Sequence, residues 1–351
     1  MTTRQSREPE HASGHLRGNG WRAALQVTVG VGALALVIMK SDLRAISEAI
    51  GSTQIALLPL AVLASFTVTW LMAYRWKLIL GARGSGLKTP RLFLYYLIGI
   101  FFMNFVPGGG VSGDVARLIY AAREVPDKAF VLSSLVYERL VGLFTLLSIG
   151  LVATLASRVG WESERGILIA EATLAVAFIL TLTLMSEAVS RRLAALSRML
   201  GERFKARRLG DAIARTVESM SELRKRRGML GAAILLSVMI RGVWGLGCFI
   251  VARAMGLPLS LPLVFSFMAL VDIVRMMPIS VGGIGVREWA MIALFATAGI
   301  SQEKAVTFSI LAFAPVYLNA IAGGLIYILS ARSRREAGSS NLAWADPRSK
   351  G

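Results

Sequence analysis

Two glycine-rich stretches resemble each other: residues 105–117 read FVPGGGVSGDVAR, and residues 277–288 read MPISVGGIGVRE. Each follows an apolar segment, contains a proline and a glycine cluster, and ends where a charged helix is expected to begin. Glycine permits the sharp backbone turn that such a break needs and lets polar groups approach the main chain. We therefore expect both stretches to interrupt apolar helices.

Long apolar segments surround these two stretches. Hydrophobic residues make up 55% of the 351-residue chain, and the mean hydropathy is +0.62. Several segments exceed the ~20 residues that a helix needs to cross a bilayer. They lack the alternating pattern of an outer-membrane β-barrel. The sequence predicts an all-α, polytopic integral membrane protein with apolar segments at 23–39, 55–74, 92–107, 129–157, 166–185, 229–255, 262–277, 286–297 and 305–329.

Composition excludes several classes of function. The formal net charge is +18, but Lys and Arg lie between the apolar segments, where lipid headgroups would be, so we expect no nucleic-acid binding. Cys248 is the single cysteine, and the two histidines, His11 and His15, lie ahead of the first apolar segment. Disulfides, Cys/His metal sites and histidine catalysis are excluded. We expect no metal and no cofactor.

Basic residues indicate how the chain crosses the membrane, because cytoplasmic loops are enriched in Lys and Arg. Residues 23–39 follow a basic N-terminal tail and lack a small-residue cleavage site, which favours a signal-anchor span. We expect a cell inner membrane protein with both termini in the cytoplasm. The cytoplasmic segments are then 1–22, 75–91, 186–228 and 331–351, and the outer ones are 40–54, 158–165 and 256–261.

Counting the crossings assigns unusual paths to the two glycine-rich stretches. Residues 92–128 must enter and leave on the cytoplasmic side, and residues 262–300 on the outer side. Similar broken helices that enter from opposite faces are typical of an inverted-topology repeat, whose half-helices meet at a substrate site near the midplane. We expect one domain over 23–330, with about six full transmembrane helices and two re-entrant elements. The alternative is that both stretches are ordinary extramembrane loops capped by glycine.

Residues 186–228 form the most basic part of the chain. Leu193, Leu196, Leu200 and Phe204 recur there at helical spacing, which predicts an amphipathic cytoplasmic helix pair near the headgroups. The alternative is a solvated linker helix that binds nothing specific. The tail after the last span, 331–351, is expected to be disordered.

Nine ionisable residues lie within or beside the apolar segments. At roughly 2.5–3.5 kcal/mol each, nine unpaired charges at membrane depth would cost on the order of 20–30 kcal/mol, so most must pair or line a hydrated cavity. Asp114 with Arg117 and Asp272 with Arg275 are i, i+3 pairs. For Asp272, Arg275 and Arg241 a static structural charge pair is as consistent with the sequence as a functional role. The nine residues are Arg117, Glu138, Arg139, Glu171, Arg241, Asp272, Arg275, Arg287 and Glu288.

Three of these arginines suggest an anion site. Arg117, Arg139 and Arg287 each adjoin a glycine-rich break or the helix that follows one. Arginine side chains together with free N–H groups at helix N-termini favour a phosphate group. Glu138 and Glu288 would serve as counter-ions or contact an amine headgroup. The predicted lipid-headgroup site is completed by Asp114, Ser112, Gly109, Gly110, Gly282, Gly283 and Gly285.

The same motifs resemble a known family. Residues 107–109, Gly113 and Asp114 with Arg117, residues 137–140 and residues 278–288 are similar to the lysylphosphatidylglycerol synthase transmembrane region, over about residues 25–330. In multiple-peptide-resistance proteins this region moves an aminoacylated phosphatidylglycerol between leaflets, and related chains act near lipid-linked sugars or hopanoids. The resemblance therefore implies lipid translocation. Those synthases carry a soluble catalytic domain that has no counterpart after residue 330 here, so we expect no aminoacyl transfer.

We interpret the sequence as a lipid flippase or lipid-binding transporter for an anionic or phosphate-containing lipid. No ATP-binding motif is present, so movement would be facilitated or ion-coupled. The alternative is a non-transporting partner that presents lipids to a separate biosynthetic enzyme, with 186–228 as its docking surface. An integral membrane enzyme is a weaker third hypothesis, because Asp114, Glu138, Asp272 and Glu288 occur without a catalytic His or Cys.

Overall fold

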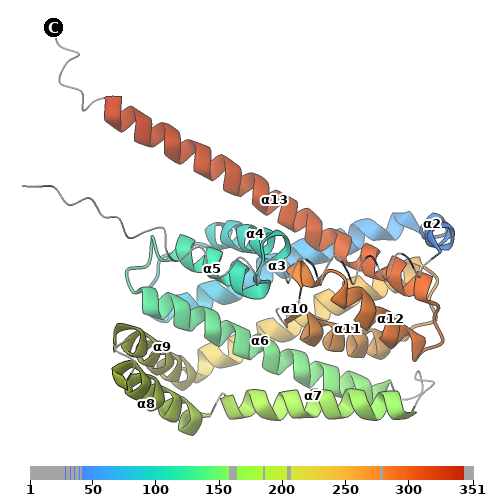
Figure 1. Ribbon diagram of the computed structural model, residues 1–351, viewed down its shortest axis with the longest axis horizontal. Coiled ribbons are helices and arrows are strands. Elements are labelled where there is room, and N and C mark those ends of the chain that lie inside the picture. The colour runs from blue at the N-terminus through green and yellow to red at the C-terminus, as the bar shows by residue number, and fades with distance from the viewer. Residues whose placement is uncertain are drawn as a thin grey trace, which may run out of the picture.

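The computed structural model of the protein describes residues 28, 32, 35, 39, 42–157, 164–184, 186–203, 207–276 and 280–343. Within these residues the chain forms twelve α-helices and no strand, which confirms the all-α prediction (Figure 1). The predicted tail 1–22 and nearly all of the predicted span 23–39 lie outside the described residues. The helices are α2 (Leu43–Gly51), α3 (Leu58–Gly81), α4 (Thr89–Phe105), α5 (Gly110–Ala121), α6 (Lys128–Ala156), α7 (Glu164–Leu184), α8 (Glu187–Arg203), α9 (Arg207–Lys225), α10 (Arg227–Ala254), α11 (Leu261–Met276), α12 (Val286–Ala296) and α13 (Gln302–Ala343).

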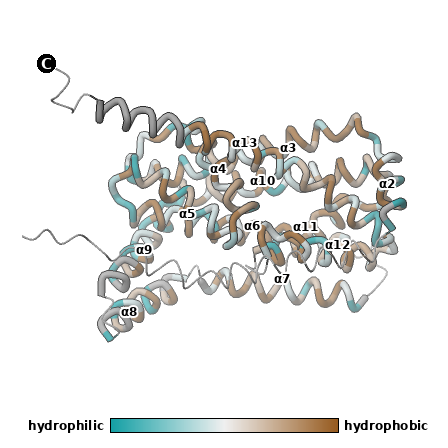
Figure 2. Tube along the Cα trace, turned by 45° about the horizontal axis from the view of Figure 1, so that its top comes forward, coloured by the Kyte–Doolittle hydropathy of each residue, from teal (hydrophilic) through white to brown (hydrophobic). Residues whose placement is uncertain are grey.

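Five described helices are long and apolar enough to cross a membrane. They coincide with five of the six full spans that the hydropathy pattern predicts. Figure 2 shows hydrophobic stretches along the long helices, with hydrophilic residues near α2 at one end and near α5 at the other. The five candidate spans are Ile55–Gly81, Lys128–Ala156, Arg165–Thr183, Arg227–Ala254 and Gln302–Ser330.

The two glycine-rich stretches lie in helical hairpins made of short helices. In the first hairpin α4 has 17 residues and α5 has 12, and in the second α11 has 16 and α12 has 11. None reaches the ~20 residues that span a bilayer. Gly109 (φ 54°) and Gly282 (φ 63°) adopt backbone conformations that side chains with a Cβ rarely tolerate. The structure therefore contains both predicted helix breaks. That the two hairpins enter the bilayer from opposite faces stays a prediction.

From their glycine-rich turns, the two hairpins extend toward opposite ends of the bundle. In Figure 1, α5 lies toward the end that carries α8 and α9, and α12 lies toward the end that carries α2. The single-turn 3-10 helix η3 (Val281–Gly283) in the second hairpin contacts α4 of the first. The glycine-rich turns of the two hairpins therefore meet, and in the second hairpin Gly282 and Gly283 are buried.

Small residues let the helices pack closely around this meeting point. Gly150 on α6 faces Ala269 on α11, where an added Cβ would come within 2.6 Å of the alanine methyl. Gly323 on α13 lies directly against the main chain of Leu97 on α4. Interfaces between membrane helices are enriched in such small residues because close backbone approach increases van der Waals contact.

The predicted start of one loop is wrong, whereas the side of the membrane on which residues 75–91 lie stays a prediction. The charge pattern assigned 75–91 to a cytoplasmic loop, but α3 continues to Gly81, and Arg75 is only 4% exposed. The helix continues because Trp76, Ile79 and Leu80 are fully buried on the next turns. The 186–228 segment does form a helix pair, α8 and α9, which pack side by side.

Candidate functional site

The tips of the two hairpins are in direct contact. A Cβ added to Gly282 would lie 2.9 Å from the carbonyl oxygen of Asn104, at the end of α4. Asn104 is 2% exposed, and its amide donates to the carbonyl of Ile100 at 2.8 Å. Tyr317 on α13 joins the tips from the side, since its ring centroid lies 6.4 Å from that of Phe105 and its hydroxyl accepts from Arg287 at 3.4 Å.

A first charge cluster, formed by Arg75, Asp114, Arg117, Glu138 and Arg139, lies beside the first tip. Arg117 on α5 donates to Glu138 on α6 at 3.0 Å and to Asp114 one turn earlier. Arg139 donates to Asp114 and, at 2.9 Å, to the carbonyl of Gly110. The aspartate is therefore shared between two arginines.

Glu138 is the centre of this first cluster. It is 2% exposed and accepts from Arg75 at 2.8 Å, from Arg117 and from the hydroxyl of Tyr96. The guanidinium of Arg117 also lies 4.2 Å from the ring centroid of Tyr96, where the ring's electron density favours a cation. Several charge-assisted contacts to one carboxylate make the burial of these charges tolerable.

A second charge cluster, formed by Arg241, Asp272, Arg275, Arg287 and Glu288, lies beside the second tip. Asp272 accepts from Arg241 at 2.7 Å and from Arg275 at 3.5 Å. Arg287 donates to Glu288 through Nε at 2.9 Å. The guanidinium groups of Arg275 and Arg287 lie 4.5 and 4.2 Å from the centroid of the Phe313 ring, which links the two halves of the cluster.

The two clusters adjoin each other through α10. Arg75 of the first cluster donates to Ser237 at 2.5 Å, and Arg241 of the second cluster follows Ser237 by one helical turn. Ten charged side chains thus form a nearly continuous row from α5 and α6 to α12. Each cluster contains three arginines and two carboxylates, so each carries a formal net charge of +1.

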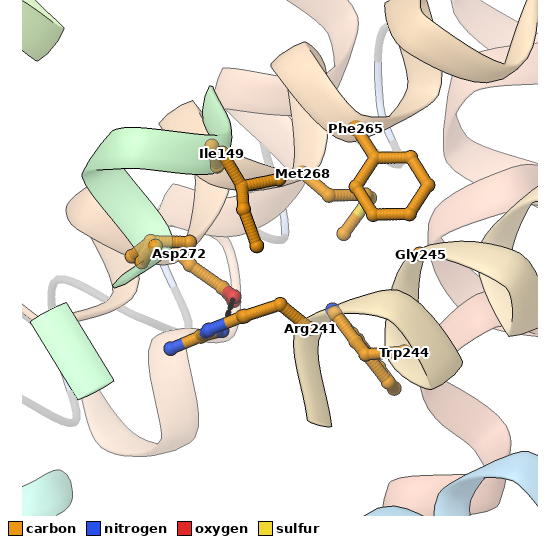
Figure 3. Close-up of a pocket in the computed structure, with 9 residues that line it drawn as sticks. Ile149, Arg241, Trp244, Gly245, Phe265, Met268 and Asp272 are labelled. Atoms are coloured by element: carbon orange, nitrogen blue, oxygen red, sulfur yellow. Dashed lines mark hydrogen bonds and ion pairs between the residues drawn. The ribbon is translucent and has the colours of Figure 1, made fainter. Parts of the chain in front are cut away.

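A pocket opens beside the Arg241–Asp272 ion pair, between α6, α10 and α11 (Figure 3). Its walls are mostly apolar. On one side the ring of Phe265 packs directly against Gly245, where an added Cβ would collide with it. The lining residues are Leu146, Ile149, Arg241, Trp244, Gly245, Phe265, Met268, Ala269 and Asp272.

The structure brings most of the predicted site residues to the two hairpin tips, but in two clusters. Arg117, Arg139, Asp114 and Glu138 meet in the first, whereas Arg287 and Glu288 belong to the second. Sequence spacing could not show this division, because it depends on which helices pack together. The predicted charge pairs of Asp272 with Arg275 and Arg241 are present as ion pairs.

Two predicted roles differ in the structure. The N–H of Gly285 at the start of α12 is not free, because the side chain of Glu288 accepts from it at 2.7 Å. The hydroxyl of Ser112 donates to the carbonyls of Phe102 and Gly109, at 2.9 and 2.7 Å, and so closes the first turn. Both contacts are local and leave neither group available to a ligand in this conformation.

Sequence reasoning missed the partners that other helices supply. Arg75 was assigned to a loop because it follows an apolar segment, and no sequence signal connects Tyr96, Ser237 or Phe313 with the charged residues. The Gly-x-x-Glu spacing of 285–288, which fits a capping carboxylate at the third helical position, was a readable signal for the role of Glu288.

Comparison with known proteins gives two matches and one negative result. The chain matches the protein family described as the lysylphosphatidylglycerol synthase TM region over residues 23–323. A UPF0104 membrane protein of Methanothermobacter thermautotrophicus is 23% identical over 297 residues, which cover 80% of this chain and 87% of that protein. No solved structure matches the chain. The family match spans both hairpins and both charge clusters.

Proposed function

The chain belongs to the family of the lysylphosphatidylglycerol synthase TM region, and on that premise we propose that it binds the anionic headgroup of a phosphate-bearing lipid and moves the lipid between leaflets. The headgroup would contact the two charge clusters while the acyl chains stay in the bilayer. No covalent step is part of the proposal, and the lipid itself is the expected partner. The proposed location is a cell inner membrane, with the α8–α9 end and both termini in the cytoplasm.

The net charge of the two clusters carries this proposal. Arg75 and Arg117 are less than 9% exposed, as is Arg287, and a buried charge without a counter-ion is costly. Each cluster is one anion short of neutrality among the described residues. A lipid phosphate supplies one negative charge and oxygens that suit the planar guanidinium group.

Arg139 has the geometry of a ligand-binding arginine. Its side chain is 40% exposed, although it lies eleven residues into the candidate span that begins at Lys128, about 16 Å along the helix axis. Nε and Nη2 donate to Asp114 and Gly110, and Nη1 donates no hydrogen bond within the part of the chain that the structure describes. An exposed guanidinium at this depth is unfavourable unless an anion or water reaches it.

The hairpins supply the elements that transport needs. Broken helices that meet at a central site occur in transporters in which one half moves against the other. Contact between the tips at Gly282 and Asn104 gives the two hairpins a shared boundary that can close on one side and open on the other. We propose that they enter the membrane from opposite faces.

Reconstitution tests this function. Purified protein in liposomes is expected to move fluorescent phosphatidylglycerol between leaflets, with movement lost in Arg139→Ala and Arg287→Ala. Arg44→Ala is the matched control, because the Arg44 side chain is 88% exposed on α2 and, among the residues that the structure describes, forms an ion pair with Glu48 alone. Normal translocation by both cluster variants would contradict the proposed site. A pure protein that moves no lipid would favour the partner hypothesis.

A further inference from the structure

Two rows of exposed apolar side chains lie on either side of Arg139. On α5 the row consists of Val111, Val115 and Ile119, which are 66%, 46% and 49% exposed. On α6 the row consists of Leu132 and Val136, which are 40% and 37% exposed. A spacing of four residues places each row on one face of its helix.

The contacts of Arg139 fix how the two rows face. Its side chain reaches Gly110 and Asp114, which are one turn apart on α5. Val111 and Val115 each follow one of these residues, so their row lies next to the strip of α5 that Arg139 touches. Leu132 and Val136 precede Arg139 by seven and three residues, on the same face of α6. Since α5 and α6 run in opposite directions, both rows point to the same side, with the guanidinium between them.

Two apolar rows with an exposed arginine between them differ from an ordinary lipid-facing helix surface. Val152, further along α6, is 66% exposed, but among the described residues no exposed arginine lies on its face of the helix. Only apolar contacts are needed where lipid merely surrounds a protein. A guanidinium that stays 40% exposed between two apolar rows fits a molecule with an anionic group attached to hydrocarbon chains.

We propose that this α5–α6 surface is the lateral entrance for the lipid. The occupant is a two-chain phospholipid with an anionic headgroup. Its phosphate contacts Arg139, and its chains lie along the α5 and α6 rows. The inference rests on the proposed function and adds the place and direction of entry, from one leaflet along the α5–α6 surface. From Arg139 the phosphate would pass to Arg117, which shares Asp114.

Photo-crosslinking from a single position tests the entrance. The full-length protein carries p-benzoylphenylalanine in place of Val115, or in place of Val152 as the matched control, and is reconstituted in vesicles of equal phosphatidylglycerol and phosphatidylcholine. Mass spectrometry then gives the ratio of the two crosslinked lipids. One arginine near a membrane surface contributes about 1 kcal/mol toward an anionic lipid, which corresponds to an enrichment of about fivefold at position 115 and none at 152.

Variants at Arg139 make the test specific. Arg139→Gln is expected to remove the enrichment at position 115 while total crosslinking is kept, and Arg139→Lys to keep part of it. Equal lipid ratios at 115 and 152 in the otherwise unchanged protein would overturn the proposal. Loss of the enrichment on addition of soluble glycerophosphoglycerol would overturn the two-chain occupant and favour a free phosphate compound.

The outcome is separable from that of the transport test. Enrichment at position 115 in a protein that moves no lipid would support the entrance and contradict transport. Transport without enrichment at 115 would contradict the entrance alone.

Discussion

The two hairpins use similar sequences and the same number of charges, yet the first is open and the second is closed. In the first cluster the Arg139 side chain is 40% exposed, whereas in the second cluster the most exposed charged side chain, that of Arg241, is 19% exposed. Glu288 caps its own helix and binds Arg287, so these two buried side chains of the second cluster pair with each other. The comparison suggests a conformation that admits ligand beside the first hairpin and excludes it beside the second.

The largest effect is expected from removing the centre of the first cluster. Glu138→Ala leaves Arg75 and Arg117 buried without their shared carboxylate, which should destabilise the protein by about 3–5 kcal/mol. Thermal or denaturant unfolding in detergent measures the loss. The control is Glu48→Ala, because the Glu48 side chain is 71% exposed and its ion pair should contribute under about 1 kcal/mol. Equal losses in the two variants would show that Glu138 does not stabilise Arg75 and Arg117 in the first cluster.

A paired substitution tests the open–closed difference itself. Glu288→Gln removes the charge that binds Arg287 and caps Gly285, and both groups are buried. Asp114→Asn removes the charge shared by Arg117 and Arg139, of which the second is accessible to solvent or ligand. We expect the first change to cost about 2 kcal/mol more than the second, measured as free energy of unfolding. A larger loss of stability in Asp114→Asn than in Glu288→Gln would contradict the difference between the open first hairpin and the closed second one.

A substitution at the contact between the two hairpin tips should change the free energy of unfolding by a smaller amount. Gly282→Ala introduces a strained positive φ and a contact with the Asn104 carbonyl, whereas Gly256→Ala introduces a similar φ of 64° with no neighbour within 4 Å. The contact should add about 1 kcal/mol to the loss of stability and slow lipid translocation. Identical stability and transport in the two variants would mean that the tips do not touch.

The smallest effect is expected outside the membrane-spanning segments. Arg83 pairs with Asp127 and Glu222, both at 2.6 Å, and the hydrogen bond with Glu222 raises the pKa of Arg83. Because its pKa is raised, the Arg83 charge stabilises the fold at every pH below the ordinary arginine pKa, so it should give no pH dependence between pH 5 and 9. Arg83→Gln should cost about 0.5 kcal/mol in low salt and less in high salt. Urea titrations at two salt concentrations measure the difference, and a loss above about 2 kcal/mol would contradict it.

The helices and the glycine-rich breaks can be predicted from the sequence. Which charged residues form ion pairs with one another cannot. Apolar segments longer than a bilayer span identify five of the helices, and glycine clusters at 108–110 and 282–285 identify the turns. Arg75 could not be placed, because the signal for its burial is Glu138 on another helix. For the same reason Arg287 was grouped with Arg117, although helix packing puts it against Phe313 and Glu288 instead.

The central claim is that the arginine clusters bind a lipid phosphate, and native mass spectrometry of protein-bound lipid tests it most directly. The protein, extracted into detergent with equal phosphatidylglycerol and phosphatidylcholine, should retain phosphatidylglycerol preferentially. Arg139→Gln should reduce that preference by about fivefold, as expected for one arginine worth about 1 kcal/mol. Arg44→Gln on α2 should leave the preference unchanged. Equal retention of the two lipids by the unaltered protein would contradict the account.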